Sequence, residues 1–148
     1  MAITSQIAGN RSIYPGEYKP LRFDIREIRD ELNMSREGAS QPVCNVIECA
    51  DHYKIEIMAP GHSRVDFIAM TDKGHLNVFA IRRKSQTEEQ PVYHSHEFNY
   101  DCFEHSILLP KNIDTDFVRA EYKAGILCVC FPKTDKLVSH HFQQIIVY

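Results

Sequence analysis

The sequence predicts an all-β fold for most of this chain: an antiparallel, immunoglobulin-like β-sandwich with a short N-terminal amphipathic helix and a flexible C-terminal tail. From Pro42 onward, apolar and polar residues alternate with the period of two that is typical of half-buried strands. Turns containing glycine or proline separate these runs, and no long helical pattern lies between them. Strands that follow one another so closely pair antiparallel, and two such sheets bury alternate residues between them.

Residues 1–41 are expected to form an arm outside the sandwich. Leu21, Ile25, Ile28 and Leu32 recur at helical spacing, with charged residues on the opposite face, which predicts a short amphipathic helix. Such a helix either packs on its own domain or joins subunits and touches other proteins. We predict the second role, because the domain that follows looks complete without the helix.

Eight short strands are expected within residues 42–133. Six of them are residues 43–48, 53–58, 65–71, 75–81, 92–98 and 103–109, and the last two flank a turn at residues 123–125. This turn and the one at residues 72–74 have three residues and end in glycine, which adopts a left-handed backbone without a Cβ clash. Pro132 ends the last strand because proline has no N–H to donate.

Four motifs in this region resemble those of a known family. Ala120, Gly125, Ile126, Leu127, Val129 and Pro132 resemble the A-x-x-x-x-G-[VI]-L-x-V-x-x-P signature that closes the α-crystallin domain of small heat-shock proteins. Residues 59–61 (APG) stand where that family carries L-P-G, and residues 109–114 (LPKNID) resemble its L-P-x-N-[VI]-D run. Residues 93–103 (YHSHEFNYDCF) align without a gap on its Y-H-R-x-E-R-x-Y-G-x-F. The motifs occur in the family's order.

The resemblance implies three parts: an N-terminal arm (residues 1–41), an α-crystallin domain (42–133) and a C-terminal extension (134–148). It also implies an ATP-independent chaperone, a holdase that binds partly unfolded proteins and prevents their aggregation during stress. Its partners are then unfolded client proteins and further copies of the chain, as dimers that build a larger homo-oligomer.

The resemblance further implies a dimer formed by strand exchange. In the bacterial and plant branch of the family, a strand within the long connection after residue 82 pairs with the first sandwich strand of a partner. The residues at this position are Val92, Tyr93, His94, His96 and Phe98. Such an exchange would cover two exposed sheet edges at once. The alternative is a loop that returns to its own domain.

The tail carries an expected anchor for assembly. Ile145 and Val147 match the family's C-terminal I-x-[IV] motif, and two apolar side chains on one face of an extended peptide suit β-augmentation. By resemblance, the anchor binds a neighbouring subunit in a groove lined by Phe67, Ala69, Val118 and Ala120. Since the tail would lie outside the sandwich core, truncating both anchor side chains is expected to leave the melting of the sandwich almost unchanged.

Other function classes find little support. The sequence has no phosphate loop, no nucleophile elbow and no dinucleotide fingerprint, so we expect neither an enzyme nor a cofactor. A net charge of −3 argues against nucleic acid, and no apolar run is long enough to span a membrane. Five cysteines without paired spacing fit a reducing compartment, and we expect a cytoplasmic protein. The C-x-C at residues 128–130 and the H-x-H at residues 94–96 lack the spacing of a structural zinc site, so no metal site is expected.

Two rival functions remain open at this point. One is a co-chaperone like the CS domain, a sandwich of similar shape that normally lacks the exchanged strand and the I-x-[IV] tail. The other is a pH- or metal-responsive binding protein on the same sandwich, which His94, His96 and His105 would serve. A large or polydisperse particle favours the small heat-shock protein, whereas a monomer favours the co-chaperone.

Overall fold

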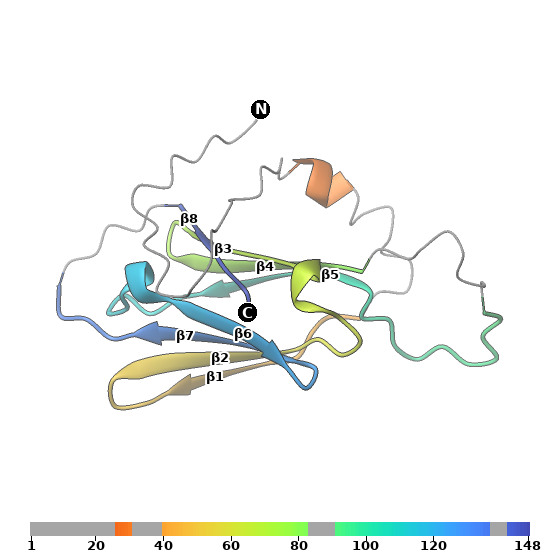
Figure 1. The fold of residues 1–148 in the computed structure, drawn as a ribbon, viewed down its shortest axis with the longest axis horizontal. Helices are drawn as coiled ribbons and strands as arrows, with labels where there is room; N and C mark the ends of the chain where they lie inside the picture. The colour runs from red at the N-terminus through yellow and green to blue at the C-terminus, as the bar shows by residue number, and fades with distance from the viewer. Residues whose placement is uncertain (1–25, 31–39, 83–90, 137–141) are drawn as a thin grey trace.

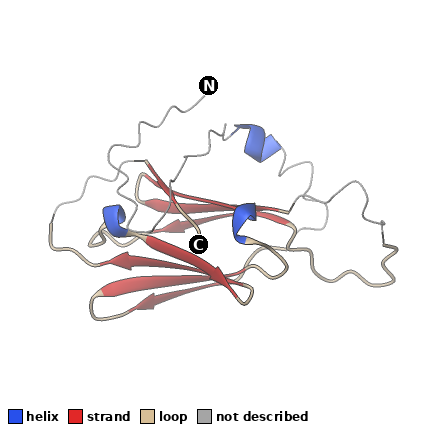
Figure 2. Cartoon of the chain, viewed as in Figure 1, coloured by secondary structure: helices blue, strands red, loops and turns tan. Residues whose placement is uncertain are grey.

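The computed structural model describes residues 26–30, 40–82, 91–136 and 142–148. In this part of the chain, two four-stranded antiparallel sheets form a sandwich (Figures 1 and 2). The first sheet has the order β1-β2-β7-β6, with strands Cys44–Glu48, His52–Met58, Ile126–Pro132 and Arg119–Lys123. The second has the order β5-β4-β3-β8, with strands Cys102–Leu108, His75–Ile81, Phe67–Asp72 and Gln143–Ile145. Two single-turn 3₁₀ helices, η1 (Arg64–Asp66) and η2 (Thr115–Phe117), precede β3 and β6. The predicted antiparallel β-sandwich is confirmed, but the end of the tail, expected to be flexible, supplies strand β8.

The core lies between the sheets and follows the alternation in the sequence. In β7, Leu127, Val129 and Phe131 are fully buried, whereas the residues between them are only half-buried. The second sheet presents its own alternate residues to the same core, among them Ala69, Leu76, Val78 and Phe103. Because the strand period is two, one register places all of these side chains in the core.

Both hairpin turns are tighter than the sequence analysis expected. Asp72 pairs with His75 and Lys123 pairs with Ile126, so each loop has two residues instead of three. Both loop residues have positive φ, with Lys73 at 48° and Gly74 at 78° in the first turn. Ala124 at 52° and Gly125 at 78° repeat this pattern in the second. A two-residue loop of this kind matches the twist of the flanking strands.

The expected strand at residues 92–98 is absent. Seven of the eight expected strands occur within a few residues of their predicted limits, but residues 91–101 form no strand. The eighth strand of the sandwich is instead β8, which comes from the C-terminal tail. Residues 92–98 have the alternation of a strand, yet within the described part of the chain no sheet edge pairs with them.

Candidate functional site

The C-terminal tail lies in a groove between the two sheets. β8 pairs with β3 in the second sheet, with Ile145 opposite Ala69. The chain then crosses to β6 in the first sheet, where Val147 forms an isolated parallel bridge with Ala120. The N–H of Tyr148 donates to the carbonyl of Ala120 over 3.0 Å, and the N–H of Tyr122 donates to the carbonyl of Tyr148 over 2.7 Å. The last six residues therefore join two strands that belong to different sheets (Figure 1).

The anchor and groove residues named from the sequence come together here. Ile145 is 4% exposed and belongs to the main core cluster, and Val147 packs against that cluster while half-buried. The four expected lining residues belong to or pack against the same cluster: Phe67, Ala69, Val118 and Ala120. In this structure the tail occupies the groove of its own chain. Binding to a neighbour's groove stays a prediction.

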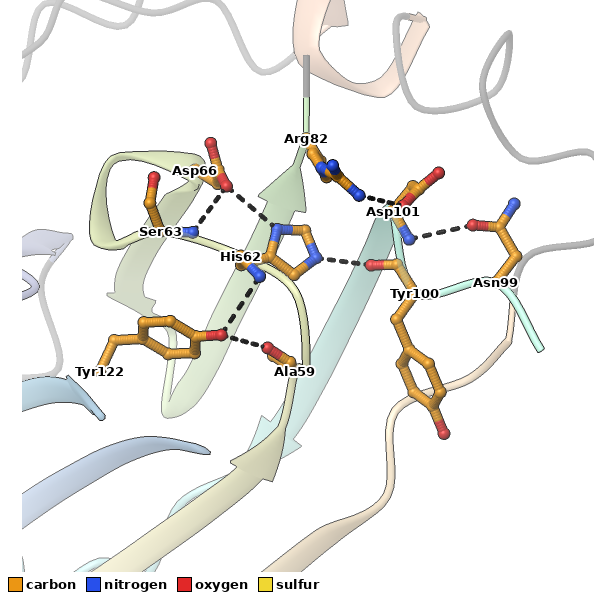
Figure 3. Close-up of polar contacts among 9 residues, drawn as sticks. All are labelled: Ala59, His62, Ser63, Asp66, Arg82, Asn99, Tyr100, Asp101 and Tyr122. Atoms are coloured by element: carbon orange, nitrogen blue, oxygen red, sulfur yellow. Dashed lines mark hydrogen bonds and ion pairs between the residues drawn. The ribbon is translucent and has the colours of Figure 1, made fainter. Parts of the chain in front are cut away.

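A buried histidine supports one wall of the groove (Figure 3). The side chain of His62 is 0% exposed. Its Nε2 lies 2.5 Å from the carbonyl oxygen of Tyr100, and its Nδ1 lies 3.3 Å from the carboxylate of Asp66. The ring also packs on Phe67, with centroids 5.4 Å apart. Since a carbonyl oxygen only accepts hydrogen bonds, Nε2 is the donor in the contact with Tyr100.

A second chain of hydrogen bonds ties the same loop to β6. The N–H of His62 donates to the Tyr122 hydroxyl over 3.2 Å, and this hydroxyl donates to the carbonyl of Ala59 over 2.6 Å. The carboxylate of Asp66 accepts from the N–H of Ser63 over 2.9 Å. Sequence reasoning missed His62, because nothing in strand periodicity marks a histidine after a Pro-Gly turn as buried. Asp66, four residues after His62, is the sequence feature that could have indicated a partner for this histidine.

The expected exchange segment stands away from the sandwich as a loop (Figure 1). Its five named residues, Val92, Tyr93, His94, His96 and Phe98, are all exposed, and Val92 is 86% exposed. The rings of Tyr93 and His96 stack with centroids 4.0 Å apart. The edge strand β1, the expected partner of this segment in a second copy, exposes Val46, as does the chain just before it at Val43. The exchange segment and the edge that it is expected to pair with therefore both expose apolar side chains to solvent.

The base of this segment is held by polar contacts. The N–H of Ser40 donates to the carbonyl of Asn99 over 2.7 Å, and the N–H of Asn99 donates to the Ser40 hydroxyl over 2.9 Å. Arg82 at the end of β4 lies 3.6 Å from the carboxylate of Asp101 (Figure 3). The segment is thus anchored at residues 99–101, next to the contact between His62 and Tyr100.

Residues 26–30 form a helical turn that packs on the outer face of the second sheet. Ile28 is buried against that sheet, and the Arg29 guanidinium lies 3.2 Å from the Glu104 carboxylate of β5. The other three predicted helix residues, Leu21, Ile25 and Leu32, lie outside the described residues. At Ile28, the structure places the helix on its own domain.

Two cysteines, Cys128 and Cys130, lie close together on β7. The sulfur atoms of Cys128 and Cys130 lie 3.9 Å apart on the outward face of the strand. Burial, and then the neighbouring Cys130, raise the pKa of Cys128 to about 11. Within the described ranges, no group of three or more histidine, cysteine or acidic residues is arranged to hold a metal ion. Also within those ranges, no helix is long and apolar enough to cross a membrane.

Comparisons with known proteins agree with this geometry. A model of the Hsp20/alpha crystallin family matches residues 45–147. Small heat shock protein C2 of Rickettsia felis is 30% identical over 95 residues, which cover 64% of this chain and 62% of that protein. Heat shock protein 16 of Schizosaccharomyces pombe is 27% identical over 126 residues, which cover 83% of this chain and 87% of that protein. The chain thus spans less than two thirds of the length of its Rickettsia relative.

The fold also matches solved structures. The crystal structure of a small heat-shock protein from Xylella fastidiosa superposes with a TM-score of 0.57. The match covers 70% of this chain and 95% of that one, at 22% identity. At that identity the likeness establishes the sandwich and its topology alone.

Proposed function

The chain belongs to the Hsp20/alpha crystallin family, and on that basis we propose that it is an ATP-independent chaperone, a holdase that binds partly unfolded proteins and prevents their aggregation. The observation that supports this most directly is the apolar groove between β3 and β6, with a short peptide of the chain's own tail bound in it. A site that holds an extended peptide with two apolar side chains is suited to exposed segments of unfolding proteins.

The bound tail is weakly held compared with the sandwich. Burying Ile145 and Val147 stabilises the closed groove by roughly 1.5–3 kcal/mol per side chain at most, before the ordering of the tail is subtracted. The tail therefore leaves the groove without unfolding the core. Once free, it enters a neighbour's groove and links subunits, while the vacated groove receives a client or another tail.

Assembly follows from repetition of weak contacts. One tail in one groove does not hold two subunits together, but many such contacts in a closed particle do, through effective concentration. We propose that dimers form first, by pairing residues 92–98 with β1 of a second copy. This pairing would remove two exposed edges, and the open apolar residues at Val92, Phe98 and Val46 favour it.

The proposed chemistry makes and breaks no covalent bond. Apolar surface on the chaperone competes with the self-association of apolar surface on the client. We propose a cytoplasmic location, because five cysteines without paired spacing suit a reducing compartment.

Aggregation of a heat-denatured client tests the proposal. The purified protein should suppress light scattering by the client equally with and without ATP. Strict dependence on ATP, or no suppression at any ratio, would contradict the holdase. Light scattering of the protein alone should show a large or polydisperse particle, and a clean monomer would favour a co-chaperone instead.

A further inference from the structure

The outer face of the second sheet carries an apolar patch where a sandwich ordinarily meets water. Inward and outward residues alternate along β3, β4 and β5, and the outward ones include four that are buried in a second cluster with Ile28: Met70, Phe79, Ile81 and Cys102. Ile68 packs against the same cluster. We call these five sheet residues the outer patch. The sheet register places Ile68 beside Phe79 and Ile81 beside Cys102, so the patch is continuous across three strands.

The helical turn of residues 26–30 lies over the outer side of the second sheet (Figure 1), and its Ile28 packs in the cluster of the outer patch. Ile28 is its buried contact, and Phe142, just before β8, packs at the same cluster. Arg29 lies beside Glu104, which faces outward from β5 directly opposite Phe79 in the register. The cover thus presents one aliphatic side chain to the patch and one cation to the carboxylate at its rim.

The contacts that hold residues 26–30 on the outer patch are weak compared with those of the sandwich core. Within residues 26–30, Ile28 is the one buried side chain, so a single apolar contact holds this turn on the patch. Its ion pair is exposed to solvent, with Arg29 57% exposed, and such pairs contribute little and are screened by salt. The core between the sheets does not depend on Ile28, which belongs to a separate cluster. Residues 26–30 can therefore detach while the sandwich stays folded.

We propose that the outer patch is a second client-binding surface and that residues 26–30 are its removable cover. The occupant is an amphipathic helical segment of a partly unfolded client in which an aliphatic residue is followed by a basic one. Ile28 and Arg29 show this pairing in place: the aliphatic side chain enters the patch and the cation meets Glu104. The inference rests on the proposed chaperone function and adds a site distinct from the groove of the tail.

Cys102 is a native reporter of the cover. Its thiol lies in the outer patch and is 3% exposed, so a maleimide reagent reaches it only when the patch opens. Labelling is followed by mass spectrometry of the peptide that contains Cys102. Arg29→Glu should speed this labelling several-fold, because it places two carboxylates side by side. Arg29→Glu combined with Glu104→Arg restores opposite charges and should return the rate to that of the original protein.

Two variants control for other causes of faster labelling. Lys111→Glu makes the same change of charge at an exposed position outside the patch and should leave the rate unchanged. Ile28→Asp should speed labelling even at high salt, because it removes the apolar contact rather than the ion pair. Circular dichroism and the melting temperature of the sandwich check that each variant remains folded.

Client binding is tested in the open variant. An excess of a heat-denatured model client should slow the labelling of Cys102 in Arg29→Glu, and a peptide of residues 22–34 should do the same. Unchanged labelling in both Arg29→Glu and Ile28→Asp overturns the cover. Faster labelling that the client does not slow, with aggregation still suppressed, overturns the client site but leaves the holdase standing. If no variant suppresses aggregation, the chaperone proposal fails, and the client-binding role of the patch fails with it.

Discussion

His62 donates a hydrogen bond from Nε2 to the backbone carbonyl of Tyr100, over 2.5 Å, from a fully buried ring (Figure 3). This hydrogen bond joins two parts of the structure that come from segments far apart in the sequence. On one side lies the groove wall, through Phe67 and Tyr122, and on the other lies the base of the exposed segment that ends at residue 101. The tail groove and the expected exchange segment therefore share one buried support.

Replacing His62 should loosen this support. His62→Phe keeps a ring between Phe67 and Phe103 but leaves the carbonyl of Tyr100 without its donor. An unsatisfied polar group of this kind costs about 1–3 kcal/mol. We expect lower stability in urea and faster amide hydrogen exchange at residues 99–101. His75→Phe, at an exposed position at the start of β4, should change neither quantity. Unaltered exchange at residues 99–101 in His62→Phe would show that the contact supports nothing.

The tail should contribute to the stability of its own sandwich. Sequence reasoning expected Ile145→Ala with Val147→Ala to leave the melting unchanged, but Ile145 lies in the main core cluster. Burial of Ile145 contributes roughly 1.5–3 kcal/mol at most, so we expect a modestly lower melting temperature together with dimers or small oligomers. Val147→Ala alone, at a half-buried position, should destabilise less. Full-sized particles of the double variant in size-exclusion chromatography with light scattering would show that the tail is not the anchor.

Tyr93→Pro should separate dimer formation from folding. Tyr93 is exposed and lies outside every strand of its own chain, so proline there leaves the sandwich intact. In a partner's sheet, the same substitution removes a ladder donor. We therefore expect native mass spectrometry to show loss of the dimer, with unchanged circular dichroism. A variant that stays dimeric would contradict the exchange of this segment.

The ion pair between Glu48 and Lys133 should make the stability of the fold depend on pH in the acidic range. The Lys133 ammonium lies 2.9 Å from the Glu48 carboxylate. The hydrogen bond from Lys133, followed by the one from the Tyr53 hydroxyl, lowers the pKa of Glu48. Because the folded pKa lies below the unfolded one, this contribution is present above the ordinary pKa of glutamate, ~4.3, and is lost as the pH falls through the folded value. Lys133→Met should flatten the decline of melting temperature in that range, whereas Lys111→Met should not. Identical profiles for Lys133→Met and the original protein would remove Glu48 as the cause.

The thiol of Cys128 should react slowly with alkylating reagents at neutral pH. Burial raises its pKa to about 11, and only the thiolate is a nucleophile. Alkylation by iodoacetamide, read by mass spectrometry, should be slow at pH 8 and accelerate as the pH approaches that value. In urea, where burial is lost, the same residue should react at the rate of an ordinary cysteine. Fast alkylation of the folded protein at pH 8 would contradict the raised pKa.

Periodicity along the chain determined the sandwich. Leu127, Val129 and Phe131 alternate with less buried neighbours, and the side-chain direction in a strand depends only on that local alternation. The family resemblance marked Ile145 and Val147 as an anchor for a neighbouring subunit's groove, whereas the structure places both residues in the groove of their own chain. Turn positions were readable for the same local reason, although the exact loop length depended on how Asp72 meets His75.

Contacts between distant segments were decided only by the tertiary structure. Residues 92–98 have the alternation of a strand, but alternation does not supply a pairing partner, and no described strand pairs with them. His62 is buried because Phe103 and Tyr100, about forty residues later, close over it. The sequence did not predict the outer patch, because Phe79 and Ile81 fit the pattern of one face of an ordinary strand. Burial on a second face requires a cover, and the alternation within a strand does not say which segment supplies it.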